Sequence, residues 1–347
     1  MPFEGWALPP GFSLREEEKA VLDGDGSPVL EFPDLTEERF RALVDRLRSS
    51  RDLLAKAPAG RILMAVDRVA RRLLDPGDDL RQRALESVGA HARYTAPMAE
   101  AVLDGMARDW TRPPLEALLH AEFRDPAVLD RIMPNPSGGE VRALGLPLTF
   151  HLGAGTVPGV AVTSMIRALL VKSAVLLKPG RGDVPLSVLF ARGFQEVDPE
   201  LGSAVAVAYW PRALGDETEV AIEMADLVVV YGGDDTVEWV RSRAPAGVHL
   251  VEYAHRIGLG LVGRAAMDGG QGAQPGSTWL GEGGTSREVV MAAARSVALF
   301  DQKGCVSPQV FFVEEGGEVG PEEWAERLAE ALSGFEEELP SGPLGPE

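Results

Sequence analysis

Cysteine is nearly absent from the sequence, which has one, Cys305, among 347 residues. One cysteine cannot form a disulfide within the chain, so no oxidising compartment is required. Also missing is any run of about 18 apolar residues, the length that a membrane-spanning helix needs. The opening residues, MPFEGWALPPGF, lack the basic and apolar segments of a signal peptide. We therefore expect a cytoplasmic protein without a membrane span.

Basic residues are scarce relative to acidic ones. The chain has 34 Lys and Arg against 53 Asp and Glu, which gives a formal net charge of -19. Such a surface repels phosphate backbones and argues against a nucleic-acid binder. Any anionic ligand would need a local basic site or the N-terminus of a helix. The five histidines show no metal-ligand spacing, so we expect no bound metal.

What is present is enough length for about two domains and a clear change of periodicity. Between residues 36 and about 123 apolar residues recur at helical spacing, as Ile62, Val66, Val69 and Leu73 do. The centre alternates short β-rich runs with helical stretches, which is typical of a doubly wound parallel α/β sheet. The expected strands are Leu146–Leu152, Ala174–Lys178, Val205–Tyr209, Leu227–Tyr231 and Val248–Glu252. The expected helices between them are Pro158–Val171, Pro185–Phe194, Asp216–Met224 and Thr236–Ser242.

The last part of the chain contains fewer elements. Residues 263–284 are Gly-rich and aperiodic, as in a loop or linker. A helix capped by Thr285, with Glu288 completing a capping box, is expected to reach about Phe300. A strand, QVFFVEE, and a helix that opens at Pro321 should follow it.

Cys305 lies in a polar turn, DQKGC, between a helix and a strand. Most single cysteines are small buried residues without a chemical role. Here Gly304 would let backbone amides approach the sulfur, and Lys303 could lower the pKa of the thiol. Under such conditions a thiolate attacks a carbonyl carbon, which makes Cys305 the candidate nucleophile.

Two glycine-containing turns follow expected strands. In HLGAGTVPG, from His151 to Gly159, two glycines match the start of a dinucleotide-binding motif, but the third comes one place late. A tight β–α turn explains this segment about as well. A helix starting at Pro158 would direct free N–H groups at an anion or oxyanion. Gly232 and Gly233 form either a close-approach loop or merely a tight turn.

The strand VLLK ends in Lys178, and Pro179 and Arg181 follow. An ordinary NAD site carries an acid at this strand end, which binds the ribose 2′-hydroxyl. A basic strand end suits a 2′-phosphate, and therefore NADP, although a solvated basic loop is the alternative. Glu252 also ends a strand, where it is a candidate general base. An exposed strand-end glutamate is a slightly better explanation of Glu252.

In this order the segments resemble the aldehyde dehydrogenase superfamily and, within it, the LuxC-type acyl-CoA reductases, over about residues 40–335. The most specific match is the nucleophile motif of that type, DQ-x-x-C-x-SPQ, which stands here from Asp301 through Cys305 to Gln309. The family's AGNVP turn corresponds to AGTVP, with Thr156 at the position of the asparagine.

Further residues follow from the same resemblance. The cofactor lysine of the family corresponds to Lys178, followed by Pro179, and the glycine beside the pyrophosphate corresponds to Gly232. The ELGGK stretch, which carries the base in the hydrolytic members, resembles EYAHR from Glu252.

The resemblance implies NADPH-dependent reduction of a fatty acyl-CoA thioester to an aldehyde, through an acyl-cysteine at Cys305. The acyl donor would be acyl-CoA or an acylated protein. Thr156 departs from the family asparagine, since a hydroxyl donates only one hydrogen bond and reaches less far. The oxyanion would then depend more on backbone amides.

The resemblance also implies two domains. Residues 1–262 would hold the N-terminal helices and an NADP-binding Rossmann-like domain, and residues 263–347 a catalytic domain that carries the nucleophile. Family members continue well beyond the nucleophile, so we expect the second domain to be incomplete at its C-terminus and the full-length form to be a homo-oligomer.

Two alternatives remain open. The first is a CoA-independent aldehyde dehydrogenase, in which Glu252 would activate water. The second is a nucleotide-binding module whose active site has decayed. Acid formation from aldehyde without CoA would favour the first. Tight NADPH binding without acylation of Cys305 would favour the second.

Overall fold

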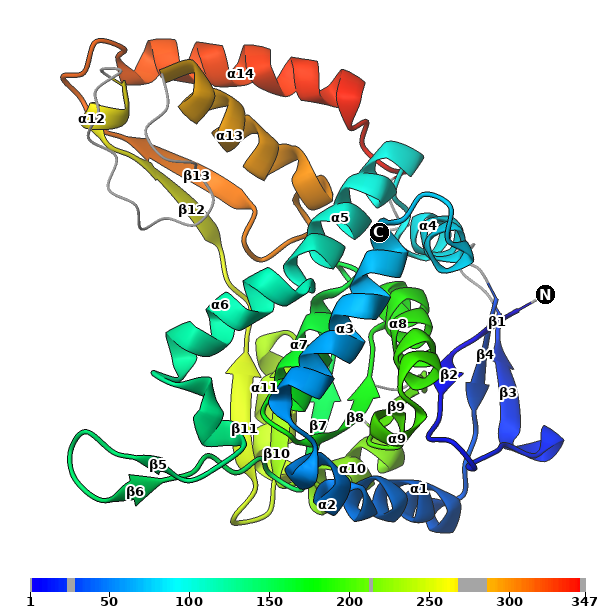
Figure 1. Ribbon diagram of the computed structural model, residues 1–347. Coiled ribbons are helices and arrows are strands. Elements are labelled where there is room, and N and C mark those ends of the chain that lie inside the picture. Colours follow the sequence, from blue (N-terminus) through cyan, green and yellow to red (C-terminus); the bar gives the residue numbers. More distant parts are fainter. Residues whose placement is uncertain (1, 24–28, 212–214, 268–285, 344–347) are drawn as a thin grey trace. The chain divides into compact units, whose positions relative to one another are not determined.

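The computed structural model describes residues 2–23, 29–211, 215–267 and 286–343 (Figure 1). Contacts divide the chain into two compact units. The larger contains residues up to Arg93 together with Leu103–Ala254, and the smaller contains Tyr94–Val102 and the chain from His255. The division after Ala254 precedes the expected boundary after residue 262, because a strand that begins at Gly258 pairs within the smaller unit.

A six-stranded sheet forms the centre of the larger unit, in the order β11-β10-β7-β8-β9-β2 (Figure 1). Its first five strands are parallel, whereas β2 pairs antiparallel with β9. The five central strands predicted from the sequence are confirmed, and with them the doubly wound α/β fold. Their bounds are β7 Leu148–Leu152, β8 Ala174–Lys178, β9 Val205–Ala208, β10 Leu227–Tyr231 and β11 His249–Tyr253, and β2 is Trp6–Ala7.

Helices cover both faces of this sheet. The chain runs from β7 through α7 (Val160–Leu170) to β8, and through α8 (Val184–Val197) to β9, in one direction across the sheet. It returns through α10 (Asp216–Met224) to β10 and through α11 (Asp234–Arg243) to β11. Because parallel crossovers are right-handed, reversing the direction places α10 and α11 on the face opposite α7 and α8. Every residue of β7, β8 and β9 is buried, as expected for strands covered on both sides.

The predicted N-terminal helical region consists of six helices. Their bounds are α1 Glu37–Ser49, α2 Arg51–Lys56, α3 Ala59–Leu74, α4 Asp79–Ala92, α5 Ala96–Asp109 and α6 Arg112–Glu122. The stripe Ile62, Val66, Val69 and Leu73 of α3 is fully buried, which confirms the helical periodicity. Helix α3 packs on α7 and α8, whereas α1 contacts α10 and β8.

Several short elements complete the larger unit. Residues near the N-terminus form a three-stranded sheet in the order β1-β4-β3. A two-stranded β5-β6 sheet and helix α9 lie further along the chain. Their bounds are β1 Phe3–Glu4, β3 Lys19–Leu22, β4 Leu30–Pro33, β5 Met133–Pro134, β6 Glu140–Val141 and α9 Pro199–Gly202.

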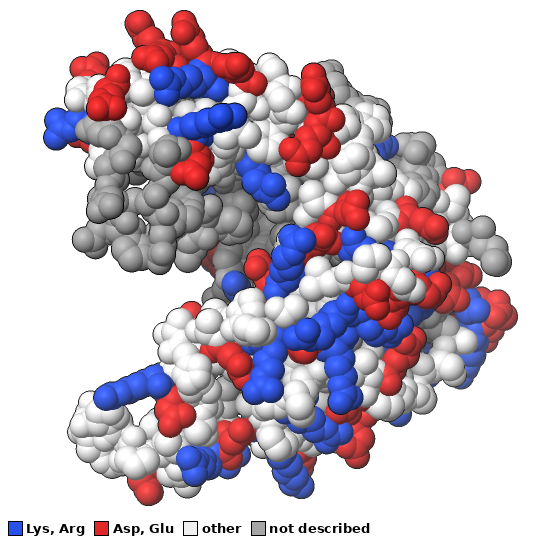
Figure 2. All heavy atoms as spheres, turned by 45° about the horizontal axis from the view of Figure 1, so that its top comes forward, with Lys and Arg blue, Asp and Glu red and all other residues white. Residues whose placement is uncertain are grey.

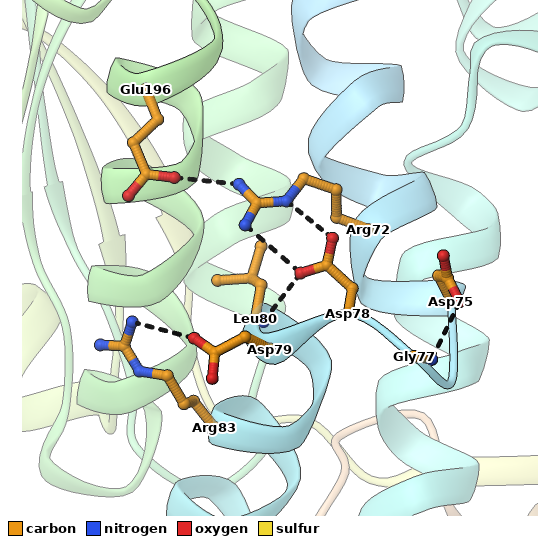
Figure 3. A network of polar contacts seen from close by, with 8 residues as sticks. All are labelled: Arg72, Asp75, Gly77, Asp78, Asp79, Leu80, Arg83 and Glu196. Atoms are coloured by element: carbon orange, nitrogen blue, oxygen red, sulfur yellow. Dashed lines mark hydrogen bonds and ion pairs between the residues drawn. The ribbon is translucent and has the colours of Figure 1, made fainter.

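Arg72 connects three helices of the larger unit (Figure 3). Its Nε lies 3.0 Å from Asp78 Oδ2, and its Nη1 lies 3.0 Å from Glu196 Oε2 on α8. Asp78 also caps α4 by accepting a hydrogen bond of 2.8 Å from the amide of Leu80. The guanidinium of Arg72 lowers the pKa of Asp78. Figure 2 shows the same mixture at larger scale, with basic side chains next to acidic ones over the visible face.

The smaller unit has its own core. The parallel strands β12 (Gly258–Val262) and β13 (Pro308–Val313) pair with each other, and α12 (Arg264–Met267), α13 (Ser286–Ala298) and α14 (Pro321–Glu338) accompany them. The core residues are Val262, Met267, Val290, Ala293, Val319 and Trp324.

The predicted strand and two helices of this unit are confirmed. Strand β12 was not predicted, because Gly258 and Gly260 interrupt its apolar alternation. The expected Thr285 cap lies outside the described residues. Among the helices that the structure describes, none combines the length and apolar character needed to cross a bilayer.

Candidate functional site

Backbone pairing places Glu252, Val230, Leu152 and Lys178 in one row across four neighbouring parallel strands. The turns after these strands carry the other predicted residues of the larger unit: Thr156, Pro179, Arg181, Gly232 and Gly233. The structure therefore brings them to the carboxyl edge of one sheet, where open α/β sheets bind ligands. Cys305 belongs to the smaller unit.

The turns after β7 and β8 pack backbone against backbone through glycines. A Cβ added to Gly180 would collide with the nitrogen of Gly155 and lie 2.5 Å from the carbonyl carbon of Ala154. A Cβ added to Gly155 would lie 2.9 Å from the nitrogen of Arg181. Gly155 therefore permits a close contact between two turns, which supports the tight-turn interpretation of HLGAGTVPG.

Asp183 holds the start of α7, the helix that follows this turn. Its side chain is fully buried and accepts hydrogen bonds from the amides of Gly159, at 2.8 Å, and Ala161, at 3.0 Å. Burial raises the pKa of Asp183 to about 7, although these two hydrogen bonds act in the opposite direction. Thr156, three residues before Gly159, is exposed.

Asp183 is not recognisable from the sequence as a residue of the site. An aspartate directly before a helix would be expected to cap that helix, α8. Asp183 occupies the N-cap position of α8, yet its carboxylate makes no capping bond there and bonds instead to the start of α7. A cap on a different helix leaves no signal in the local sequence.

Lys178 is a buried cation. Its residue is only 4% exposed, and its Nζ lies 5.2 Å from the centre of the Tyr209 ring. Burial lowers the pKa of Lys178 to about 8. Within the described part of the chain, no carboxylate pairs with this ammonium. A buried ammonium without a carboxylate is suited to bind an anionic or hydroxyl-bearing ligand.

The neighbouring glycines and Arg181 lie around the same edge. The positive charge of Arg181 acts on both His91 and Tyr209. The amide of Gly232 donates to the carbonyl of Tyr253 at 3.2 Å. A Cβ at Gly232 would meet Thr236 at 3.0 Å, whereas one at Gly233 would meet nothing within 4 Å. Gly233 is therefore the more open of the two positions.

Glu252 is held by Arg241, a residue of α11. The Nε and Nη2 of Arg241 donate to the two carboxylate oxygens at 3.0 Å and 2.6 Å. Both oxygens of Glu252 are thus occupied by one guanidinium. This pairing favours the structural interpretation of Glu252 over the role of a general base.

The candidate nucleophile lies at the tip of a turn. The amide of Ser307 donates to the carbonyl of Gly304 at 3.0 Å, so Cys305 and Val306 occupy the two central positions. Cys305 is exposed, and Val306 is 63% exposed. Ser307, in contrast, is buried. The turn therefore exposes Cys305 to solvent, while buried Ser307 anchors the end of the turn in the fold.

The backbone before this turn is strained. Phe300, Asp301 and Gln302 have φ angles of 67°, 49° and 56°, in the left-handed region. Each such non-glycine residue costs about 1–2 kcal/mol. Strain of this kind is retained where the surrounding structure imposes it, often at functional sites.

The ammonium of Lys303 contacts two other groups of the smaller unit. Its Nζ lies 3.3 Å from Asp301 Oδ2 and 4.5 Å from the centre of the Tyr94 ring. Asp301 Oδ2 also accepts a bond of 3.3 Å from the amide of Gly342. The expected effect of Lys303 on the sulfur is therefore shared with a carboxylate and an aromatic ring.

The histidines do not form a metal centre in the described ranges, where no group of three or more His, Cys, Asp or Glu could hold an ion. His151 is fully buried between Ser164, at 2.7 Å, and Thr149, at 2.9 Å. Burial lowers the pKa of His151 to about 3. This imidazole is therefore neutral at ordinary pH.

Comparisons with known proteins identify the family of the chain. A family model described as acyl-CoA reductase (LuxC) matches residues 54–344. The long-chain acyl-protein thioester reductase of Vibrio harveyi is 26% identical over 270 residues, which cover 75% of this chain and 51% of the relative. The long-chain acyl-protein thioester reductase 2 of Photobacterium leiognathi is 24% identical over 207 residues, which cover 58% and 38%. The chain thus spans about half, or less, of the length of these relatives.

Solved structures show the fold class. A NAD-dependent benzaldehyde dehydrogenase from Corynebacterium glutamicum superposes with a TM-score of 0.69 at 16% identity, over 98% of this chain and 70% of that chain. An NADP-dependent glyceraldehyde-3-phosphate dehydrogenase from Bacillus halodurans C-125, in complex with NADP, gives 0.61 at 12% identity, over 96% and 66%. At these identities the likeness shows an aldehyde-dehydrogenase-like fold and no more.

Proposed function

Because the chain belongs to the acyl-CoA reductase (LuxC) family, we propose that it takes part in the reduction of a fatty acyl thioester to an aldehyde through an acyl-cysteine. The observation that carries this proposal is the exposed position of Cys305 at the tip of its turn, within the DQ-x-x-C-x-SPQ match. An exposed thiol on a fixed turn is accessible to a carbonyl carbon, whereas a buried one is not.

The covalent step is assigned to Cys305. Its thiolate attacks the thioester carbonyl, a carbon–sulfur bond forms, and the thiol of the donor leaves and takes up a proton. Amides of the turn around Cys305 would stabilise the oxyanion of the tetrahedral intermediate.

We assign cofactor binding to the carboxyl edge of the six-stranded sheet. The buried ammonium of Lys178, which no carboxylate neutralises within the described residues, fits an anionic cofactor there. Lys178 and Arg181 add positive charge where an NAD-specific site would carry an acid, which supports NADPH. When bound, NADPH supplies the hydride that reduces the acyl group. Pro179, Gly232 and Gly233 would shape the turns around it.

The acyl donor is proposed to be acyl-CoA or an acylated protein. The family description supports the first, and the name of the Vibrio harveyi relative, a long-chain acyl-protein thioester reductase, supports the second. Both donors present the same group, a fatty acyl thioester. Water must be excluded after CoA or the donor protein leaves, because hydrolysis of acyl-Cys305 would compete with reduction.

The hydrolytic alternative requires Glu252 as a base. Its two oxygens both accept hydrogen bonds from Arg241, so the carboxylate that would take a proton from water is already engaged by a guanidinium. The arrangement therefore supports reduction over hydrolysis.

The test is acylation of the only thiol. We expect one adduct by mass spectrometry after treatment with labelled fatty acyl-CoA, and none in Cys305→Ala. Val306→Ala, at the neighbouring exposed position of the turn, is the matched control and should keep the adduct. Adding NADPH should release labelled aldehyde. An adduct at another residue would refute the mechanism, and formation of acid from aldehyde and NAD(P)⁺ without CoA would favour the hydrolytic alternative.

A further inference from the structure

A groove of about 610 Å³ lies along one face of the six-stranded sheet in the larger unit. Small-molecule sites have volumes of about 300–1,000 Å³, so the groove is large enough for one. Its walls are mainly apolar and come from α6, the segment 143–146, α7, β10 and β11. The function proposed above makes no use of it.

The topology explains why this face is open. Helix α7 connects β7 to β8, whereas α10 and α11 lie on the other face of the sheet. Side chains of β10 and β11 that point to the α7 side therefore line the groove. They are Leu227, Val229, Tyr231, Val251 and Tyr253. Val251 and Tyr253 are each 39% exposed, so the apolar wall reaches solvent.

Polar groups lie only at particular points of the groove. Below it, His151 bonds to Thr149 and Ser164, and the side chain of Ser164 bonds to Tyr231. The rings of Tyr231 and Tyr253 stack with their centres 4.5 Å apart and nearly parallel, at 4°. The two tyrosines thus place hydroxyl groups next to an otherwise apolar channel.

The rim carries one cation of interest, Arg167. Its side chain is exposed, lines the groove, and is close enough for its charge to act on Tyr231. No ion pair joins Arg167 to a carboxylate within the described residues. Glu122 also lines the groove and disfavours an anion in its own vicinity. An anionic head would therefore lie beside Arg167 and the tyrosines.

We propose that this groove binds a long-chain fatty carboxylate, with its alkyl chain along the apolar wall and its carboxylate at Arg167, Tyr231 and Tyr253. An apolar wall favours an alkyl chain, because burying each CH₂ group removes apolar surface from water. The local cation is required because a chain of net charge -19 repels anions elsewhere.

This site is separate from the proposed cofactor site. Thr149, His151, Tyr231 and Tyr253 point to the α7 side, whereas Lys178 stands in the alternate row of strand positions and points to the opposite face. The inference therefore does not depend on the proposed reaction or on Cys305.

The test measures binding of dodecanoate and of dodecanol to the full chain by displacement of a fluorescent fatty acid. We expect the acid to bind about tenfold more tightly than the alcohol, because a hydrogen bond from a cation to a carboxylate is stronger than one to a hydroxyl and the rim is partly solvated. Arg167→Gln should remove that preference and leave dodecanol binding unchanged. Arg68→Gln, an exposed arginine on α3 outside the groove, is the matched control and should change neither.

A second variant tests the channel. Val251→Trp fills the groove from an exposed strand position and should weaken the acid and the alcohol alike, by tenfold or more. Cys305→Ala should still bind dodecanoate with wild-type affinity, which separates groove binding from acylation. Absence of binding, or wild-type binding in both Arg167→Gln and Val251→Trp, would overturn the proposal. Loss of binding in Cys305→Ala would assign the ligand to the nucleophile instead.

Discussion

The Oδ1 atom of Asp183 lies 2.8 Å from the backbone nitrogen of Gly159, a residue of a different β–α turn. Asp183 follows β8, and Gly159 follows β7 and precedes α7. This buried hydrogen bond, together with the one to Ala161, fixes the start of α7 and the turn that carries Thr156. The position of the turn that carries Thr156 thus depends on the carboxyl group of Asp183, which comes from the neighbouring turn.

We expect the contribution of Asp183 to stability to depend on pH. Burial raises its pKa to about 7, above the unfolded value, so between about pH 4 and 7 the folded state holds a proton that the unfolded state releases. The free energy of unfolding should therefore fall as pH rises through this window, by up to about 1.4 kcal/mol per pH unit. Above about pH 7 the contribution is constant.

Denaturant unfolding of the wild type and of Asp183→Asn at several pH values measures this effect. The amide does not titrate, so the stability of the wild type relative to the variant should decrease from pH 4.5 to 7. A difference that is independent of pH would mean that Asp183 stays ionised in the fold.

Gly180→Ala should be strongly destabilising. The added Cβ would collide with the nitrogen of Gly155, and backbone atoms cannot yield as a flexible side chain can. Overpacking of this kind costs about 1–3 kcal/mol. Gly233→Ala is the matched control, because a Cβ there meets nothing within 4 Å.

Thermal unfolding distinguishes the two glycine variants, and we expect Gly233→Ala to unfold like the wild type. The same variant should bind NADPH more weakly if the backbone at Gly233 approaches the cofactor. Equal stability of Gly180→Ala and the wild type would show that the two turns can separate without cost.

The sequence predicted the strands of the sheet because each one leaves a local pattern. Ala174–Lys178 and Leu227–Tyr231 are continuous apolar runs, and the structure has them at the predicted residues. The two-residue strand β2 could not be predicted, since it forms only where Trp6 and Ala7 meet β9. Strand β12, whose glycines weaken the pattern, likewise depends on its pairing with β13.

The contacts around the candidate site were harder to predict from the sequence than the fold. The sequence drew attention to Lys178 and Glu252 by their positions at strand ends. It did not reveal that Arg241 would occupy both oxygens of Glu252, or that Asp183 would bond to another helix. Such contacts join residues of different elements, whose mutual placement follows from tertiary packing.

Glu252→Gln should leave the reductase rate nearly unchanged. Both oxygens of Glu252 accept bonds from Arg241, an arrangement that serves the fold. Loss of a general base would lower the rate by about 100-fold or more. Single-turnover decay of acyl-Cys305, with NADPH for reduction and without it for hydrolysis by water, measures the difference, with Arg241→Gln as the companion variant. A decrease of that size in Glu252→Gln alone would make Glu252 a base. Loss of the partly exposed ion pair should cost only about 0–1 kcal/mol of stability.

Lys178 should make NADPH binding more favourable than NADH binding, and in a pH-dependent manner. Lys178→Ala removes a charge-assisted contact worth about 1.5–3 kcal/mol, so NADPH affinity should fall roughly 10- to 100-fold and NADH affinity much less.

Burial lowers the pKa of Lys178 to about 8, so the free protein loses this charge as pH rises above that value. NADPH affinity should then decrease by up to about tenfold per pH unit, while the affinity of Lys178→Ala stays flat. Lys178→Arg keeps its charge at all these pH values and should hold its NADPH affinity constant up to pH 10. Fluorescence titration with both cofactors provides the measurement. Equal losses of NADPH and NADH in Lys178→Ala would show that the lysine binds the ribose that both share, and the preference for the 2′-phosphate would have to come from Arg181.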